Sequence, residues 1–122
     1  DKLTCQKGWR LFKSSCYLFY DADPPDQKTW EEAREDCRER SSDLADELRY
    51  FSQYTHWYWI GLRAEGGRWK WINGSDLTES GWRRKPPPPT DGQCVVYDMF
   101  RWRSESCAER RPWICKKKTL SV

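Results

Sequence analysis

Six cysteines in a chain of 122 residues constrain the fold more than any other feature. They are spaced 11, 21, 57, 13 and 8 residues apart and form no Cys-x-x-Cys pair, which disfavours zinc ribbons and thioredoxin-like redox sites. An even number at scattered spacings favours three disulfide bonds and an oxidising compartment, with free buried thiols as the alternative. The spacing alone leaves the pairing open.

Aromatic side chains must supply much of the core. Only 18 residues are Leu, Ile, Val or Phe, and the mean hydropathy is −1.06, a composition that usually points to disorder. The chain nevertheless has 9 Trp and 6 Tyr, and each buried aromatic side chain removes roughly 150–250 Å² from water. We therefore expect one small disulfide-bonded domain over residues 1–122 with an aromatic core.

Charge and hydropathy exclude some classes of protein. No apolar run is long enough to cross a membrane, and the first residues do not form a signal peptide, so we expect a mature form or an excised ectodomain. The net charge of +3 is uneven, because residues 1–61 carry −3 and residues 62–122 carry +6. The basic half is either a surface for an acidic partner or a solvated surface. The basic residues do not form a dense stripe of the kind that indicates nucleic-acid binding.

The residue pattern predicts helices between strands. Residues 5–20 are typical of a β-hairpin. Thr29 followed by Glu32 forms a capping-box pattern and predicts a helix that ends between Arg38 and Ser42. The spacing of leucines predicts a second short helix over residues 43–52.

The second half of the chain is rich in predicted strands. Residues 73–93, with their prolines and glycines, form a long irregular segment of the kind that often carries function. Strands followed by helices and then more strands indicate an α+β domain. The predicted strands are Trp57–Leu62, Trp69–Trp71, Cys94–Tyr97, Arg101–Arg103 and Trp113–Cys115.

An ordered series of motifs carries a family resemblance. The series is Gly8-Trp9, Cys16-Tyr17, Trp30 to Cys37, Trp59-Ile60-Gly61-Leu62, Trp69-Lys70-Trp71, Cys94, Trp102 to Cys107 and Trp113-Ile114-Cys115. In this order the chain resembles the C-type lectin-like domain over residues 5–116, and most closely natural-killer-cell receptors and their lectin-like ligands. The resemblance implies two helices packed on antiparallel sheets, a long irregular loop and three disulfides.

The resemblance also implies how the cysteines pair. The implied bonds are Cys5–Cys16, Cys37–Cys115 and Cys94–Cys107. One region departs from the family pattern, since the stretch between Cys37 and Trp59 is short. The strand that usually follows the first helix has no clear counterpart there.

Sugar-binding members of this family hold Ca²⁺ with Glu-Pro-Asn or Gln-Pro-Asp in the loop and with Trp-Asn-Asp before the fifth cysteine. Here these positions read Lys85-Pro86-Pro87 and Trp102-Arg103-Ser104, and the acidic pair before Cys94 reads Gly92-Gln93. Calcium needs 6–8 oxygen ligands, and the only Asn of the chain, Asn73, lies outside both motifs. We expect no calcium site of this kind and no cofactor. Asp91 and Asp98 are the alternative ligands for an unconventional ion, but two carboxylates without companions are more often surface residues, so we expect no metal.

The sequence does not contain the parts of a catalytic site. His56 is the only histidine, and no convincing nucleophile–base set accompanies it. The carboxylates of the first predicted helix indicate a solvated face, because helix-face spacing does not place two of them across a cleft. We expect a binding protein and not an enzyme.

A basic segment in the long loop is the candidate partner-binding surface. Arg and Trp are enriched in binding hot spots, and four consecutive prolines favour a stiff polyproline II segment. We expect Arg101 and Arg103 to flank Trp102 on an exposed face near the same loop. Core packing is the alternative for Trp82. The candidate contact residues are Trp82, Arg83, Arg84, Lys85, Arg101 and Arg103.

The hypothesis is an extracellular recognition domain of an immune-type cell-surface receptor or ligand, which binds a protein partner without calcium. By resemblance it would be a homodimer and the ectodomain of a type II membrane protein, with a secreted form as the alternative. Asn73-Gly74-Ser75 is an N-glycosylation sequon. The rival functions are a calcium-independent lectin that stacks sugars on Trp57 or Trp82, a venom-type subunit, and a polyanion binder that uses the basic half.

Overall fold

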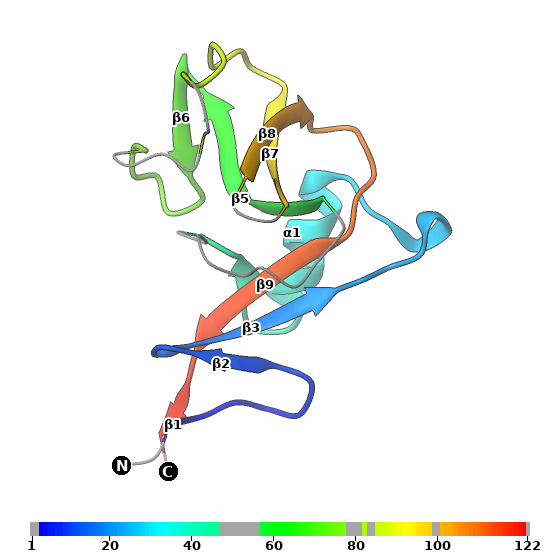
Figure 1. Ribbon diagram of the computed structural model, residues 1–122, viewed down its shortest axis with the longest axis vertical. Helices are drawn as coiled ribbons and strands as arrows, with labels where there is room; N and C mark the ends of the chain where they lie inside the picture. The colour runs from blue at the N-terminus through cyan, green and yellow to red at the C-terminus, as the bar shows by residue number, and fades with distance from the viewer. Residues whose placement is uncertain (1–2, 47–56, 78–81, 83–84, 99–100, 122) are drawn as a thin grey trace.

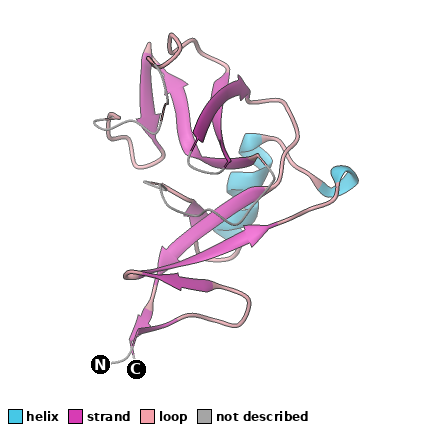
Figure 2. Cartoon of the chain, viewed as in Figure 1, coloured by secondary structure: helices cyan, strands magenta, loops and turns pink. Residues whose placement is uncertain are grey.

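The computed structural model describes residues 3–46, 57–77, 82, 85–98 and 101–121. Among the described residues, a short 3-10 helix and one α-helix interrupt a largely β structure (Figures 1 and 2). The elements are β1 Leu3–Thr4, β2 Arg10–Phe12, β3 Ser15–Tyr20, the 3-10 helix η1 Pro24–Asp26, α1 Trp30–Glu39, β4 Asp43–Leu44, β5 Tyr58–Glu65, β6 Arg68–Trp71, β7 Gln93–Asp98, β8 Arg101–Ser106, β9 Trp113–Lys118 and β10 Leu120–Ser121.

Most strands belong to one sheet. Its order is β2-β3-β9-β5-β7-β8, with β4 paired to β9 and β6 paired to β5. The pairings are antiparallel except between β5 and β9, where Trp59 and Trp113 form a parallel bridge. A separate ribbon of β1 and β10 lies at the end of the molecule that holds both termini, and β6, β7 and β8 lie at the other end (Figure 1). The predicted α+β class is confirmed.

The first helix begins where the capping box predicts. The Thr29 hydroxyl accepts a hydrogen bond from the Glu32 backbone N–H at 3.3 Å, and the Glu32 carboxylate accepts one from the Thr29 N–H at 3.1 Å. These two bonds satisfy backbone donors that a helix start leaves without partners. The face of α1 that packs on the sheet carries Trp30, Ala33 and Cys37, all fully buried.

The prediction of a second helix that begins at residue 43 is wrong at its start. Asp43 and Leu44 form β4, whose register pairs Asp43 with Lys116 and Leu44 with Cys115. A fully buried Leu44 fits a helix stripe and a strand equally well, and pairing with β9 decides between them. The strand that usually follows the first helix, for which the sequence showed no clear counterpart, is therefore present as β4. The rest of the predicted helix, residues 47–52, lies outside the described residues.

Two aromatic clusters form the core on the two faces of the sheet. One contains Tyr58, Tyr97 and Trp102 together with the tryptophans of β6. The other lies under α1 and contains Trp30, Trp59 and Trp113. Buried indoles need acceptors, and Trp30, Trp59 and Trp113 donate to the Ile60 carbonyl, the Lys28 carbonyl and the Asp36 carboxylate at 2.9, 2.9 and 3.0 Å.

The disulfides are those that the resemblance implied. Cys5–Cys16 closes the β1–β3 region, Cys37–Cys115 joins α1 to β9, and Cys94–Cys107 joins β7 to the segment after β8. Cys37 and Cys115 are fully buried within the cluster under α1. Covalent bonds thus reinforce a core that has few aliphatic side chains. Among the described residues, no helix is long and apolar enough to cross a membrane.

Candidate functional site

The long irregular segment returns to the sheet along β6 and enters β7. Trp69 of β6 donates its indole N–H to the Pro87 carbonyl at 2.9 Å, which fixes the proline segment against the sheet. At the end of the segment, the Cys107 N–H donates to the Gly92 carbonyl at 2.9 Å. The Cys94–Cys107 disulfide lies beside this contact. The start of β7 and the end of β8 are therefore held together where the segment ends.

Trp82 belongs to a cluster of four tryptophans. Its ring centroid lies 5.4 Å from that of Trp69 and 5.8 Å from that of Trp102, and Trp102 packs edge-to-face on Trp71. Trp82 is half-buried and packs on the core. The structure thus assigns Trp82 the core contact that was the alternative at the sequence level, and a contact with a partner stays a prediction.

An apolar hollow of about 580 Å³ lies beside this cluster and is lined by Trp69, Lys85 and Pro86–Pro89. Lys85 is exposed and has no carboxylate within ion-pair distance among the described residues. Within the described part of the chain, its positive charge therefore has no acidic partner at the edge of the hollow. Arg83 and Arg84, the other basic candidates of this segment, lie outside the described residues.

Arg101 and Arg103 of β8 pack on a tryptophan that the sequence left unassigned. Their guanidinium carbons lie 5.4 Å and 4.0 Å from the ring centroid of Trp57, close enough for cation–π attraction. We call Trp57, Arg101 and Arg103 the Trp57 platform. Both arginine side chains remain more than 40% exposed, at 44% and 43%.

Acidic neighbours hold the two arginines in place. Arg101 pairs with Asp98 at 3.4 Å, and Arg103 forms an ion pair with Glu105. Glu105 also accepts two hydrogen bonds from Arg111, at 2.8 and 2.9 Å. Three guanidinium groups thus share two carboxylates, which leaves one net positive charge at this position.

The expectation that Arg101 and Arg103 lie near the long loop needs correction. Cross-strand partners share a face, and β8 pairs Arg101 with Asp98 and Arg103 with Val96, which belongs to the cluster under α1. Trp102 points to the opposite face, into the cluster that holds Trp82. The Trp57 platform therefore lies on β8, at one edge of the sheet, whereas the Lys85 hollow lies on the opposite face, beside Trp69 of β6.

The positions that hold calcium in sugar-binding relatives are engaged in other contacts. Ser104 donates its hydroxyl to the Gln93 side-chain oxygen at 2.8 Å. Arg103 occupies another of these positions, and its side chain contacts Glu105 and Trp57. Within the described part of the chain, no group of three or more His, Cys, Asp or Glu side chains is arranged to hold a metal ion.

The sequon lies in an exposed turn after β6. The Asn73 side-chain oxygen accepts hydrogen bonds from the Ser75 N–H at 2.9 Å and from the Ser75 hydroxyl at 2.6 Å. Gly74 has a φ of +89°, a conformation that suits glycine. Asn73 itself is exposed.

Comparison with known proteins agrees with this fold. The family model for the lectin C-type domain matches residues 26–117. Human C-type lectin domain family 17, member A is 33% identical over 130 residues, with 96% of this chain and 33% of that protein aligned. Dog natural killer cells antigen CD94 is 32% identical over 128 residues, with 98% of this chain and 69% of that protein aligned. The chain thus spans a third of the first relative and about two thirds of the second.

Solved structures show the same fold at lower sequence identity. The carbohydrate-recognition domain of cow CD23 superposes with a TM-score of 0.82 at 23% identity, covering 98% of this chain and 100% of that chain. A calcium-independent type II antifreeze protein superposes with a TM-score of 0.81 at 20% identity, covering 98% of both chains.

Proposed function

Because the chain belongs to the C-type lectin domain family, we propose that it is an extracellular recognition domain of an immune-type cell-surface receptor or ligand. In this proposal it binds a protein partner without calcium, through the β8 edge. The similarity to CD94 supports the receptor class. Three disulfides support an oxidising, extracellular location. We propose that the domain is the ectodomain of a type II membrane protein.

Arg103 gives the main support for the proposal that binding does not require calcium. A carboxylate or amide oxygen is needed at this position to bind calcium, and a guanidinium offers only donors and a positive charge. Arg103 is also held by Glu105 and by the Trp57 ring, at 4.0 Å from its centroid. Clearing the site for a cation would break both contacts.

The Trp57 platform has the composition of a protein-binding hot spot. Arg101 and Arg103 are positioned by packing and ion pairs, so little side-chain freedom remains to be lost on binding. The surplus of positive charge there favours an acidic partner surface. The rival aromatic-stacking lectin is less well supported, since Trp57 already has guanidinium groups against it and Trp82 packs between two other indoles.

The test is capture of the partner from cell surfaces with the soluble domain, followed by affinity measurement with the purified partner. Replacing Arg101 and Arg103 together with alanine should weaken binding about tenfold or more, as expected for hot-spot residues. The matched control replaces Arg68 and Arg110, which form exposed ion pairs elsewhere, with alanine and should retain affinity. Equal losses in both variants would contradict the proposed surface.

Calcium and sugar are tested in the same assay. Binding should be unchanged when a chelator replaces calcium, and a calcium titration of the domain should release no heat. A requirement for calcium, or selective binding on a glycan array, would favour a lectin instead.

We also propose that the domain forms a homodimer through its β2 edge. β2 is the outer strand of the sheet at the end opposite to β8, and Leu11 there is 51% exposed. An edge strand with an exposed leucine can pair with a second copy. Sedimentation of the domain should give a dimer, and Leu11→Lys should give a monomer.

A further inference from the structure

The fold gathers positive charge from both ends of the sequence at one end of the molecule. Residues 3–20 contain three basic residues and no acidic one, and residues 116–121 contain three basic residues and no acidic one. β3 pairs with β9 along its whole length, and β1 pairs with β10, so these two segments lie side by side. Since the whole chain has a net charge of only +3, the remainder is net acidic.

Several lysines at this end have no carboxylate partner. Among the described residues, Lys7, Lys13 and Lys118 are exposed and form no ion pair. Lys117 donates only to the neutral Gln6 side chain, at 2.7 Å, and lies over the Trp9 ring at 4.1 Å. Lys116 forms an ion pair with Asp46 at 2.6 Å. We call Lys7, Lys13, Lys117 and Lys118 the basic end.

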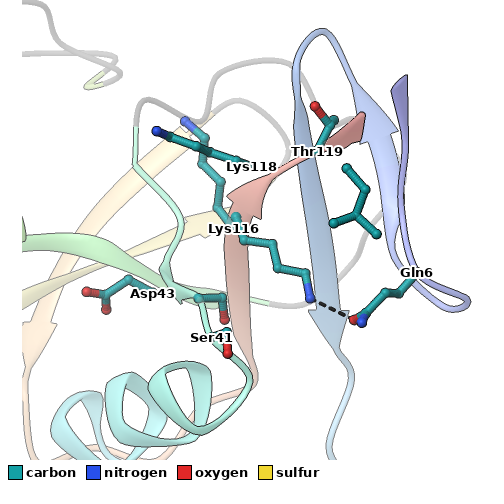
Figure 3. Close-up of a pocket in the computed structure, with 9 residues that line it drawn as sticks. Gln6, Ser41, Asp43, Lys116, Lys118 and Thr119 are labelled. Atoms are coloured by element: carbon teal, nitrogen blue, oxygen red, sulfur yellow. Dashed lines mark hydrogen bonds between the residues drawn. The ribbon is translucent and has the colours of Figure 1, made fainter. Parts of the chain in front are cut away.

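An open hollow of about 570 Å³ lies at this end, between the end of α1 and β10. Ser41 and Asp43 lie on one side of the strand that carries Lys116 and Lys118, and Gln6 lies on the other (Figure 3). The Asp43 carboxylate is turned to Arg34, at 3.2 Å. The strand thus carries ammonium groups with hydroxyl groups on one side of it and the Gln6 amide on the other, a combination that suits an anionic sugar chain.

We propose that the basic end binds an extended, sulfated polysaccharide. Successive side chains of a strand alternate between its faces, so Lys117 and Lys118 project on opposite sides of β9, and one small anion cannot contact both. A polymer with repeated sulfate groups can reach both and continue to Lys13, since Lys118 is paired in register with Ser15 beside the β2–β3 turn. An anionic membrane fits less well, because acidic lipids concentrate in the cytoplasmic leaflet whereas the disulfides indicate an oxidising compartment. This binding does not depend on the β8 edge.

The experiment measures the affinity of the domain for heparin by calorimetry at two salt concentrations. Lys13→Gln with Lys118→Gln should weaken heparin binding about tenfold and reduce its salt dependence, because two exposed charge contacts are lost. The matched control, Arg68→Gln with Lys70→Gln in β6, changes the net charge equally at the other end and should bind like the parent. None of the four residues is buried, and unchanged circular dichroism verifies folding.

Three results would overturn the proposal. Equal losses of heparin affinity in the two double variants would show that binding depends on the net charge of the domain and not on the basic end. Heparin binding that is undetectable in the parent would exclude the site. Binding to vesicles rich in phosphatidylserine, but not to heparin, would assign the basic end to a membrane. None of these results bears on partner binding at the β8 edge, so the two proposals fail separately.

Discussion

The Cys37–Cys115 disulfide should be the largest covalent contribution to stability. It joins residues 78 apart, whereas Cys5 and Cys16 are 11 apart. In the chain-entropy model a closed loop of this length stabilises the fold by about 4.5 kcal/mol, against about 2.8 kcal/mol for the short loop. Replacing Cys37 and Cys115 with alanine should therefore cost roughly 1.7 kcal/mol more than replacing Cys5 and Cys16, on loop entropy alone.

Packing acts in the same direction, so this difference is a lower bound. Cys37 and Cys115 are fully buried in the cluster under α1, whereas Cys5 is partly exposed. Removing two buried sulfur atoms leaves a void that adds to the entropic loss. The free energies of unfolding of the parent and both double variants, from urea titration followed by tryptophan fluorescence, measure the comparison. A long-loop variant as stable as the short-loop variant would refute the reasoning, whereas a long-loop variant that fails to fold beside a folded short-loop variant agrees with it.

Three further changes test the fold and the modification site. Gly61→Ala should destabilise the domain by about 1–3 kcal/mol in thermal unfolding, because the new Cβ would lie 3.0 Å from the Leu44 carbonyl oxygen, and an unchanged melting temperature would contradict this. Hydrogen bonds from the Thr29 backbone and side chain lower the pKa of Glu32, so its stabilising effect is present above the ordinary glutamate pKa and is lost as pH falls through the folded value. Urea unfolding of Glu32→Gln should therefore lose less stability on acidification than the parent, and equal losses would refute the coupling. Finally, we propose that Asn73 is glycosylated, so the domain secreted from mammalian cells should lose mass on treatment with an N-glycosidase, and Asn73→Gln should be indifferent to the enzyme.

Local signals predicted much of the fold. The capping box at Thr29 and the continuous apolar run from Trp57 to Leu62 each specify one element without help from distant residues. Residues 43–44 could not be predicted in this way, because a short strand on β9 is decided by a partner more than 70 residues away. The cysteine pairing came from the family resemblance, since the spacing allowed several solutions.

The candidate site was predicted less well than the fold. Strand alternation was available in the sequence and places Arg101 and Arg103 on the face opposite to Trp102. The contact of both arginines with Trp57 depends on β5, β7 and β8 lying side by side, which no local pattern contains. The basic end was hidden for a similar reason, because counting charge by sequence halves separates two segments that the fold joins.

The pairing of β1 with β10 determines how the domain would respond to a pulling force. Leu3 is opposite Ser121 and Thr4 is opposite Leu120, so tension applied at both ends separates these pairs one after another instead of shearing them together. The load then reaches residues that the Cys37–Cys115 bond joins covalently, and the loop between them, with most of the sheet, bears none of it. Under tension the β1–β10 pairs should separate while the β8 edge stays folded.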